Sequence, residues 1–216
     1  MHSDEVLAFL EADPAFLQAH AARFGLRPAA ERVVVPLAER QLLELRDKTR
    51  QLEGRLAQLL AHGEANDRTL GRLHRLTLAL LAEDEPSALV EALTSTFADA
   101  FGLDRVALRL WHPAAAALPA LCCTREAIRQ HARNLSAPYC GPYANDEVIG
   151  WFPAQPVLES FAQLPLRAPG REPFGLLVLA SGDADRFTRA MHTQYLAQIG
   201  EMVSAALLRV LERGAR

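Results

Sequence analysis

Residues 164–207 decide the fold, and they read LPLRAPGREPFGLLVLASGDADRFTRAMHTQYLAQIGEMVSAAL. The run begins inside a predicted strand, SFAQLPLR (160–167), and passes through FGLLVLAS (174–181), whose unbroken apolar character suits a central strand. After a turn at Asp183 and Asp185, the spacing predicts a long amphipathic closing helix with Thr188 as its cap. Its apolar side chains recur every three or four residues: Met191, Tyr195, Ile199, Met202, Val203, Ala206 and Val210.

The residues before this run extend the same mixed domain. PSALVEALTSTFADAFG (86–102) predicts an amphipathic helix that starts at Pro86 and stops at Gly102. DRVALRLW (104–111) alternates apolar and other side chains, which indicates a strand with one face on the core. PALCCT (119–124) is a weaker strand candidate, and TREAIRQHARNL (124–135) predicts a helix from Thr124. We therefore expect an α+β domain over residues 83–216.

The stretch between Pro36 and Pro86 contains no proline and carries a heptad repeat. With Leu42 at position a, leucine fills most of the a and d positions: Leu42, Leu45, Leu52, Leu56, Leu59, Leu70, Leu73 and Leu80. Such a repeat predicts a coiled coil over 37–82 that joins two copies, either parallel or antiparallel. In a parallel pair, Lys48 would face Glu53 of the second copy. The alternative is a pair of helices that bend near Gly63 and fold back on each other or on the domain.

The remaining N-terminal residues, 1–36, predict two short helices. SDEVLAFLEA (3–12) and DPAFLQAHAARFGL (13–26) carry Ser3 and Asp13 as caps and Gly25 as a stop signal. The sequence thus divides into short helices at 1–36, a long helix at 37–82 and a domain at 83–216.

Composition limits the function. The 23 basic and 26 acidic side chains give a formal charge of -3, so no global field attracts nucleic acid as a direct partner. The chain has no apolar run of membrane-spanning length, and its start is acidic where a secretory signal would be basic, so we expect a cytoplasmic protein. The three cysteines form no pair of CxxC units, and no HxxxH or HExxH motif occurs, which predicts no metal site.

The order of these pieces resembles the GAF domain. Together with DPAFLQAH (13–20), residues 35–67, PYCG (138–141) and RFTRAMHTQYLAQIGE (186–201), it resembles the bacterial family called domain of unknown function 484. The resemblance implies a GAF-like antiparallel sheet flanked by helices and preceded by a long N-terminal helical, coiled-coil arm. It implies no known reaction. GAF domains bind small molecules between the sheet and the irregular middle of the domain, or act as dimeric signalling scaffolds.

The irregular middle includes PYCGPYANDEVIGWF (138–152), which is rich in aromatic side chains. Aromatic rings with polar tips suit a small-ligand pocket, and two acids could orient a cationic or hydroxylated ligand. The predicted ligand-binding residues are Trp111, Tyr139, Tyr143, Asp146, Glu147, Trp151 and Phe152. The alternative is that the rings only close the core and the acids are solvated. The sequence predicts no particular cofactor, because the motifs by which other GAF domains bind bilins or cyclic nucleotides are missing.

Cys140 offers the one catalytic alternative. In some GAF-like proteins a cysteine in this region reduces free methionine sulfoxide, and Cys122 or Cys123 would then serve as the resolving thiol. The neighbours of Cys140 suit a tight turn, so a buried structural thiol is the competing interpretation. Arg125, Arg129 and Arg133 would form a basic stripe on one helix, either for an acidic partner or as a solvated face.

Three functions follow from these observations. The leading hypothesis is a non-enzymatic, homodimeric sensor or regulatory module that binds a small ligand or a separate protein partner. The second is a thiol-dependent reductase of small sulfoxides. The third is a structural adaptor with no ligand.

Overall fold

The structure is a computed structural model that describes residues 3–26, 37–155 and 157–213. The chain divides into two compact units, Met1–Leu60 and Ala61–Arg216. The helix α3 (Leu37–Ala82) crosses this division, so residues 61–82 belong to the second unit.

A four-stranded antiparallel sheet forms the centre of the second unit. Its strands are β1 (Arg105–Leu110), β2 (Tyr139–Gly141), β3 (Ser160–Arg167) and β4 (Pro173–Ser181), in the order β1-β4-β3-β2. As predicted from its apolar run, β4 is central, and residues 173–180 are buried throughout. At Gly175 a Cβ atom would lie 2.6 Å from Leu110 Cδ2 and 3.0 Å from the Arg109 carbonyl oxygen, so glycine allows β1 to approach β4.

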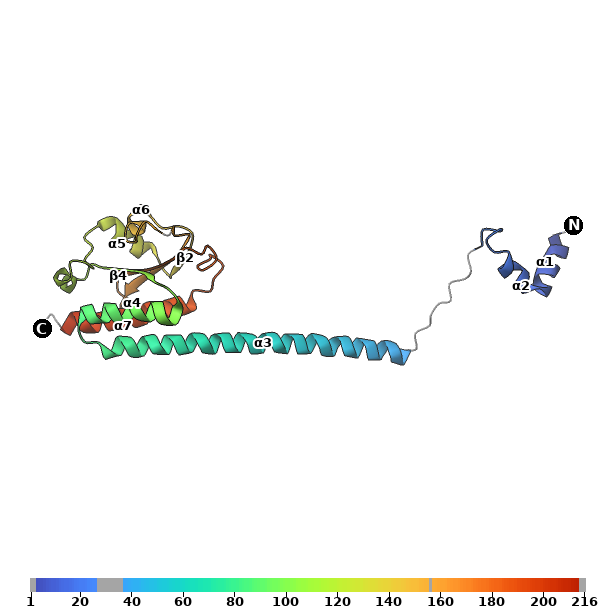
Figure 1. Cartoon of the computed structure of the whole chain (residues 1–216), viewed down its shortest axis with the longest axis horizontal. Helices are drawn as coiled ribbons and strands as arrows, with labels where there is room; N and C mark the ends of the chain where they lie inside the picture. Colours follow the sequence, from blue (N-terminus) through green and yellow to red (C-terminus); the bar gives the residue numbers. More distant parts are fainter. Residues whose placement is uncertain (1–2, 27–36, 156, 214–216) are drawn as a thin grey trace. The chain divides into compact units, whose positions relative to one another are not determined.

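Helices cover both faces of the sheet (Figure 1). On one face lie α4 (Pro86–Phe101), α7 (Gln194–Arg213) and the end of α3, while α5 (Glu126–Asn134) and α6 (Asp146–Ile149) cover the other. The side chains of β4 alternate between the two faces of the sheet. Leu177 and Leu179 pack in the core on the side of α4 and α7, whereas Leu176 and Val178 pack in the core on the side of α5 and α6. We call these the α7 face and the α5 face of the sheet.

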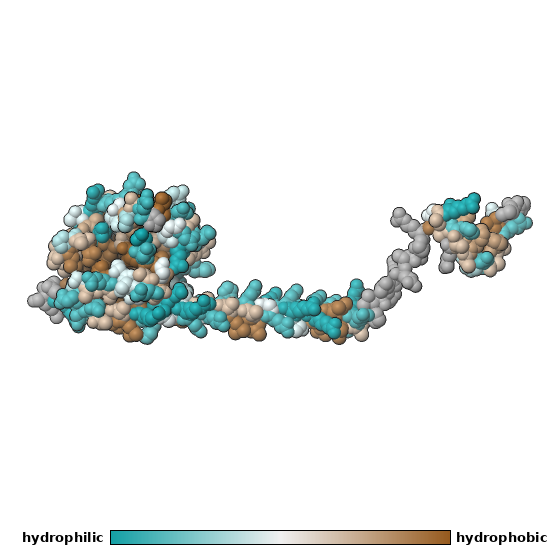
Figure 2. All heavy atoms as spheres, in the orientation of Figure 1, coloured by the Kyte–Doolittle hydropathy of each residue, from teal (hydrophilic) through white to brown (hydrophobic). Residues whose placement is uncertain are grey.

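The long helix α3 (Leu37–Ala82) is assigned as a single helix, whereas the alternative predicted two separate helices. Most of its seam leucines are exposed: Leu42, Leu45, Leu52, Leu56, Leu59 and Leu70. Figure 2 shows hydrophobic side chains recurring along this helix between hydrophilic ones.

The predicted seam needs one correction, because Leu73 and Leu80 are buried in the core of their own domain together with Leu76. In a straight α-helix a heptad position rotates by about 20° per repeat. Over the five heptads from Leu45 to Leu80 the d position therefore turns by about 100°, away from the exposed side and onto the α7 face.

Several local expectations hold. The helix at 86–101 starts with Pro86 and ends at Gly102, which has φ 64° and donates to the Ala98 carbonyl oxygen at 3.1 Å. The N-terminal helices α1 (Ser3–Ala12) and α2 (Pro14–Ala19) also form, but α2 ends at Ala19 and residues 20–25 form turns, so the predicted stop at Gly25 is wrong. Phe9 packs edge-on against Phe16 with 5.3 Å between ring centroids.

Other local expectations were wrong. Residues 119–124 form no strand; Cys122 makes only an isolated bridge to Leu110. Cys140 does not lie in a tight turn but in β2, opposite Ala162 of β3. The closing helix begins at Gln194 instead of near Thr188. A turn closed by the Met191 N–H and the Thr188 carbonyl oxygen at 3.0 Å precedes it, and the Thr193 carbonyl oxygen accepts the Ala197 N–H at 2.8 Å. Helix α5 begins at Glu126, two residues after the predicted start.

Candidate functional site

The α5 face carries a cleft of about 740 Å³ between β1, the entry to α5, and α6. Three of the predicted ligand residues line it, Asp146, Glu147 and Trp151. The other lining residues are Arg109, Cys122, Cys123, Thr124, Arg125 and Gly150. The sequence thus identified one wall of the cleft and missed most of the opposite wall.

Arg109 of β1 and Trp151 form the aromatic and cationic part of the cleft. The Arg109 guanidinium carbon lies 5.1 Å from the centroid of the Trp151 ring, within the range of a cation–π contact. One guanidinium nitrogen, Nη1, also donates to the Leu108 carbonyl oxygen at 2.8 Å. These contacts hold a half-buried positive charge at the cleft wall, where it can meet a carboxylate or phosphate.

The acids enter the cleft from the first turn of α6. Asn145 caps this turn, since its Oδ1 accepts the Val148 N–H at 2.8 Å. Glu147 Oε1 lies 3.3 Å from Arg125 Nε, and Asp146 is exposed. The cleft therefore presents both signs of charge beside one tryptophan, which suits a small polar molecule with ionic groups.

The backbone of the adjacent cysteines is fixed at the third wall. The Cys123 N–H donates to the Leu110 carbonyl oxygen at 2.7 Å, and the Leu110 N–H donates to the Leu121 carbonyl oxygen at 2.8 Å. Cys122 is half-buried and Cys123 is buried. Both residues therefore belong to the frame of the cleft.

Four predicted ligand residues lie outside the cleft lining. Trp111 packs on the α5-face core and donates from Nε1 to the Pro173 carbonyl oxygen at 2.6 Å, and Phe152 packs on the same core. Both rings thus pack on the core of this face and do not line the cleft. Tyr139 is half-buried on β2, while Tyr143 is 67% exposed with the Arg189 guanidinium 5.4 Å from its ring centroid.

A buried amide, which the sequence did not suggest, holds the segment that leads to the cleft. Gln163 of β3 is 2% exposed; its Nε2 donates to the Tyr143 carbonyl oxygen at 3.0 Å and its Oε1 lies 2.6 Å from His131 Nε2. Since Oε1 can only accept, His131 donates from Nε2 in this arrangement. The pair ties α5, β3 and the chain beyond β2 together.

Cys140 is separated from the other two cysteines by the sheet. It belongs to the core cluster of the α7 face, whereas Cys123 belongs to that of the α5 face. Burial also raises the pKa of the Cys140 thiol, which lowers the thiolate fraction. This arrangement does not bring Cys140 within reach of Cys122 or Cys123 for disulfide exchange.

The arginine stripe on α5 is neutralised by neighbouring acids. Arg133 contacts Glu126 at 2.8 Å and Glu172 at 3.1 Å, and the hydrogen bond to Glu126 is the main reason that its pKa is raised. Arg129 lies 3.9 Å from Glu126, and Arg125 pairs with Glu147 as described. The stripe is thus the solvated, ion-paired side of the helix.

Within residues 3–26, 37–155 and 157–213, no group of His, Cys, Asp and Glu side chains is arranged to hold a metal ion. Over those same residues, no helix is long and apolar enough to cross a membrane.

Solved structures with a similar fold include GAF domains. The GAF domain of a phosphoenolpyruvate-protein phosphotransferase from Coxiella burnetii is 11% identical, with a TM-score of 0.50 over 69% of this chain and 98% of that one. The GAF domain of the potassium sensor histidine kinase KdpD from Escherichia coli is 20% identical, with a TM-score of 0.43 over 67% and 96% of the two chains. Free methionine-R-sulfoxide reductase from Neisseria meningitidis is 16% identical, with a TM-score of 0.46 over 65% and 87%.

The likeness to the GAF domain from Coxiella burnetii agrees with the observed architecture, a four-stranded antiparallel sheet between helices with a long helix ahead of it. A comparison with curated proteins gave no match. Residues 1–212 match the model of the family described as a protein of unknown function, DUF484, and the chain therefore belongs to that family and carries a GAF-like domain.

Proposed function

We propose that this protein is a homodimeric regulatory module whose GAF-like domain binds a small polar molecule in the cleft between β1, α5 and α6. The observation that carries the proposal is the convergence of Arg109, Trp151 and the two α6 acids on one cleft. A tryptophan beside fixed charges is the arrangement by which small-molecule sites combine apolar contact with orientation. We propose no reaction for the site.

The mixed charge of the cleft favours a ligand with both an anionic and a cationic or hydroxyl group. A guanidinium pairs well with a carboxylate or phosphate, and the exposed Asp146 is available to an ammonium or hydroxyl group. Glu147 and Arg125 already pair at 3.3 Å, and a ligand that enters the cleft would compete with this exposed contact at little cost.

Dimerisation is supported by the exposed leucines of α3. The seam leucines from Leu42 to Leu70 are about half to two thirds exposed. A helix that stays single in water would leave this apolar surface uncovered, without the free energy that its burial contributes. In a parallel pair, the Lys48 and Glu53 side chains add complementary charges beside this seam. A second copy of the same helix would cover these side chains.

The reductase alternative has less support from the geometry. A nucleophilic cysteine needs thiolate character and a resolving thiol in reach, and Cys140 has a raised pKa and lies across the sheet from Cys123. No observation favours that second function over ligand binding.

The ligand site is tested with a defined panel of amino acids, organic acids and nucleotides, scored by thermal shift on the full chain. A compound present at 100 times its Kd stabilises the folded state by about 2.7 kcal/mol, or roughly 5 to 11 °C for a chain of this size. We expect Trp151→Leu to abolish the shift. The matched control is Tyr143→Leu, which alters an exposed ring outside the cleft and should keep it. A hit that survives Trp151→Leu unchanged would show that this cleft is not the site.

A further inference from the structure

A second cavity lies between α7 and the connection from β3 to β4. It measures about 440 Å³, and its walls are residues 167–170 on one side and Glu201, Ser204, Ala205 and Leu208 of α7 on the other. A smaller cavity of about 120 Å³ adjoins it, because Arg167, Glu201 and Ser204 line both. We call the two cavities together the hairpin groove. It shares no lining residue with the cleft of the α5 face.

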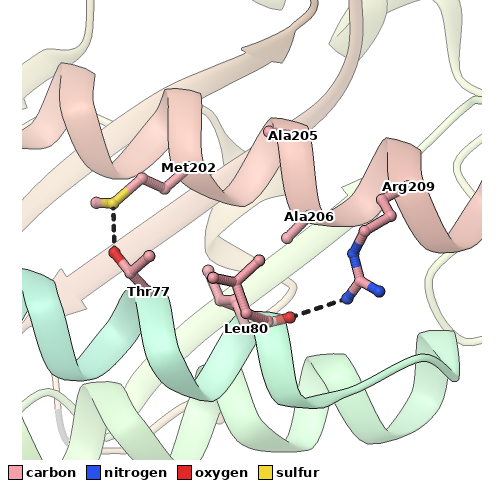
Figure 3. Close-up of a pocket in the computed structure, with 7 residues that line it drawn as sticks. Thr77, Leu80, Met202, Ala205, Ala206 and Arg209 are labelled. Carbon is pink, nitrogen blue, oxygen red and sulfur yellow. Dashed lines mark hydrogen bonds between the residues drawn. The ribbon is translucent and has the colours of Figure 1, made fainter.

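Helix α7 turns one side toward α3 and another toward the hairpin groove. Figure 3 shows Met202 and Arg209 of α7 beside Thr77 and Leu80 of α3. The polar groups on that side are bonded within the chain: the Thr77 hydroxyl lies 2.9 Å from the Met202 sulfur, and Arg209 Nη2 donates to the Leu80 carbonyl oxygen at 3.1 Å. At about 100° per residue, the side that lines the groove lies about 120° around α7 from the side that meets α3. A molecule in the groove would therefore not have to displace α3.

Hydrogen bonds hold Arg167 at the wall of the groove. Its N–H donates to Ser204 Oγ at 3.0 Å, and Ser204 is only 2% exposed, so the end of β3 is tied to α7. The half-buried guanidinium donates from Nη2 to the Leu135 carbonyl oxygen. Both printed partners of Arg167 are neutral, so its positive charge is positioned in the groove and is left for an anionic group.

Glu201 brings the opposite charge to the same groove. Its carboxylate is exposed and forms no ion pair with any residue that the structure describes. Arg167 and Glu201 thus line the same two cavities without contacting each other. The rest of the larger cavity is mostly apolar, with Ala168, Pro169 and Leu208 around the two charges.

We propose that the hairpin groove binds a free α-amino acid with an apolar side chain. The ligand carboxylate pairs with Arg167, its ammonium pairs with Glu201, and its side chain lies on Ala168, Pro169 and Leu208. A ligand with a single charge would leave one of the two protein charges unpaired in a groove from which it displaces water. The volume of the larger cavity falls within the range of about 300 to 1,000 Å³ that small-molecule sites occupy. This site is additional to the cleft proposed above and does not depend on it.

The ligand class is tested by isothermal titration calorimetry of the full chain with three matched compounds. L-Phenylalanine carries both charges, 3-phenylpropanoate lacks the ammonium, and phenethylamine lacks the carboxylate. We expect L-phenylalanine to bind about 10-fold or more tightly than either of the other two, since each of them loses one charge-assisted hydrogen bond. L-Leucine should bind as well, whereas glycine, which has no side chain, should bind more weakly than both.

Glu201→Gln tests the protein side of the same contact. Because Glu201 is exposed, the substitution should leave the fold intact, which circular dichroism verifies. We expect the Kd of L-phenylalanine to rise by about 10-fold and the Kd of 3-phenylpropanoate to stay the same or fall, because only the amino acid uses the carboxylate. A general disturbance of the groove would weaken both compounds. The matched control is Glu212→Gln, at an exposed glutamate of α7 outside the groove, which should bind all compounds like the wild type.

The outcomes also separate the groove from the cleft. If neither L-phenylalanine nor L-leucine binds at millimolar concentration, or if L-phenylalanine binds no better than the compounds that lack one charge, the proposal is overturned. Binding of L-phenylalanine that Glu201→Gln leaves intact and Trp151→Leu abolishes would place the amino acid in the cleft, which overturns the groove site and supports the cleft.

Discussion

Leu52→Ala should weaken the dimer without weakening the folded monomer. Leu52 is 63% exposed in the single chain, and alanine has the highest helix propensity, so α3 itself is preserved. The substitution removes three carbon atoms, worth about 2.4 kcal/mol if fully buried. Multiplied by the exposed fraction of Leu52, the loss of dimerisation free energy is about 1.5 kcal/mol per copy and about 3 kcal/mol per dimer. This loss corresponds to a rise of roughly 100-fold in the dissociation constant of the dimer.

The control uses the same substitution on the same helix. Leu43 is 51% exposed and lies nine residues from Leu52, which at about 100° per residue places it on the opposite side of α3. Sedimentation equilibrium should therefore show that Leu43→Ala dimerises like the wild type. If both substitutions weaken dimerisation equally, or if neither weakens it, the assignment of Leu52 to the dimer interface is refuted. Thermal unfolding at a concentration where the protein is monomeric should give the same Tm for all three chains.

Three further predictions concern the domain itself. Gly175→Ala should destabilise it by about 1 to 3 kcal/mol, measured by urea unfolding, because the added Cβ meets Leu110 at 2.6 Å. Arg209→Met should cost about 1.5 to 3 kcal/mol, since the carbonyl oxygens at the end of α3 lose a charged donor; Arg171→Met, at an exposed arginine of the β3–β4 connection, should change the unfolding free energy little. The pKa of Cys140 is raised from its ordinary 9.0 by burial, so the folded chain holds this proton to higher pH than the unfolded chain does. The resulting stability is fully present below pH 9 and is lost as pH rises through the folded pKa; unfolding midpoints of the wild type should therefore fall more steeply above pH 9 than those of Cys140→Ala.

The strands and helices of the domain were predictable where one periodicity dominated. The apolar run at 174–181 could only be satisfied at the centre of a sheet, and β4 is buried on both faces. The turns before α7 were harder, because Met191 happens to continue the helical spacing although it lies outside the helix and is 39% exposed. Spacing alone does not show where an apolar side chain remains in water.

The cleft could be predicted only on its α6 side. The acids and Trp151 are close in sequence, so composition revealed them together. Arg109 comes from a strand 42 residues earlier, and its cation–π contact with Trp151 depends on the packing of α5 and α6 over the sheet. The sequence does place Arg109 on the same side of its strand as Ala107 and Trp111. A charged side chain on a partly covered face of a sheet requires a partner, and this requirement could have pointed to Arg109.

The heptad repeat shows how one pattern can serve two surfaces. The leucines at the d positions would face a single partner only if α3 supercoiled along its whole length. Where α3 instead follows its own domain, the slow rotation of the repeat moves Leu73 and Leu80 to the α7 face, and the core that they form fixes the end of the helix. The same rotation leaves Leu78 and Leu81 on the outside. The exposed side of α3 must therefore be identified from the exposure of its leucines together with their periodicity.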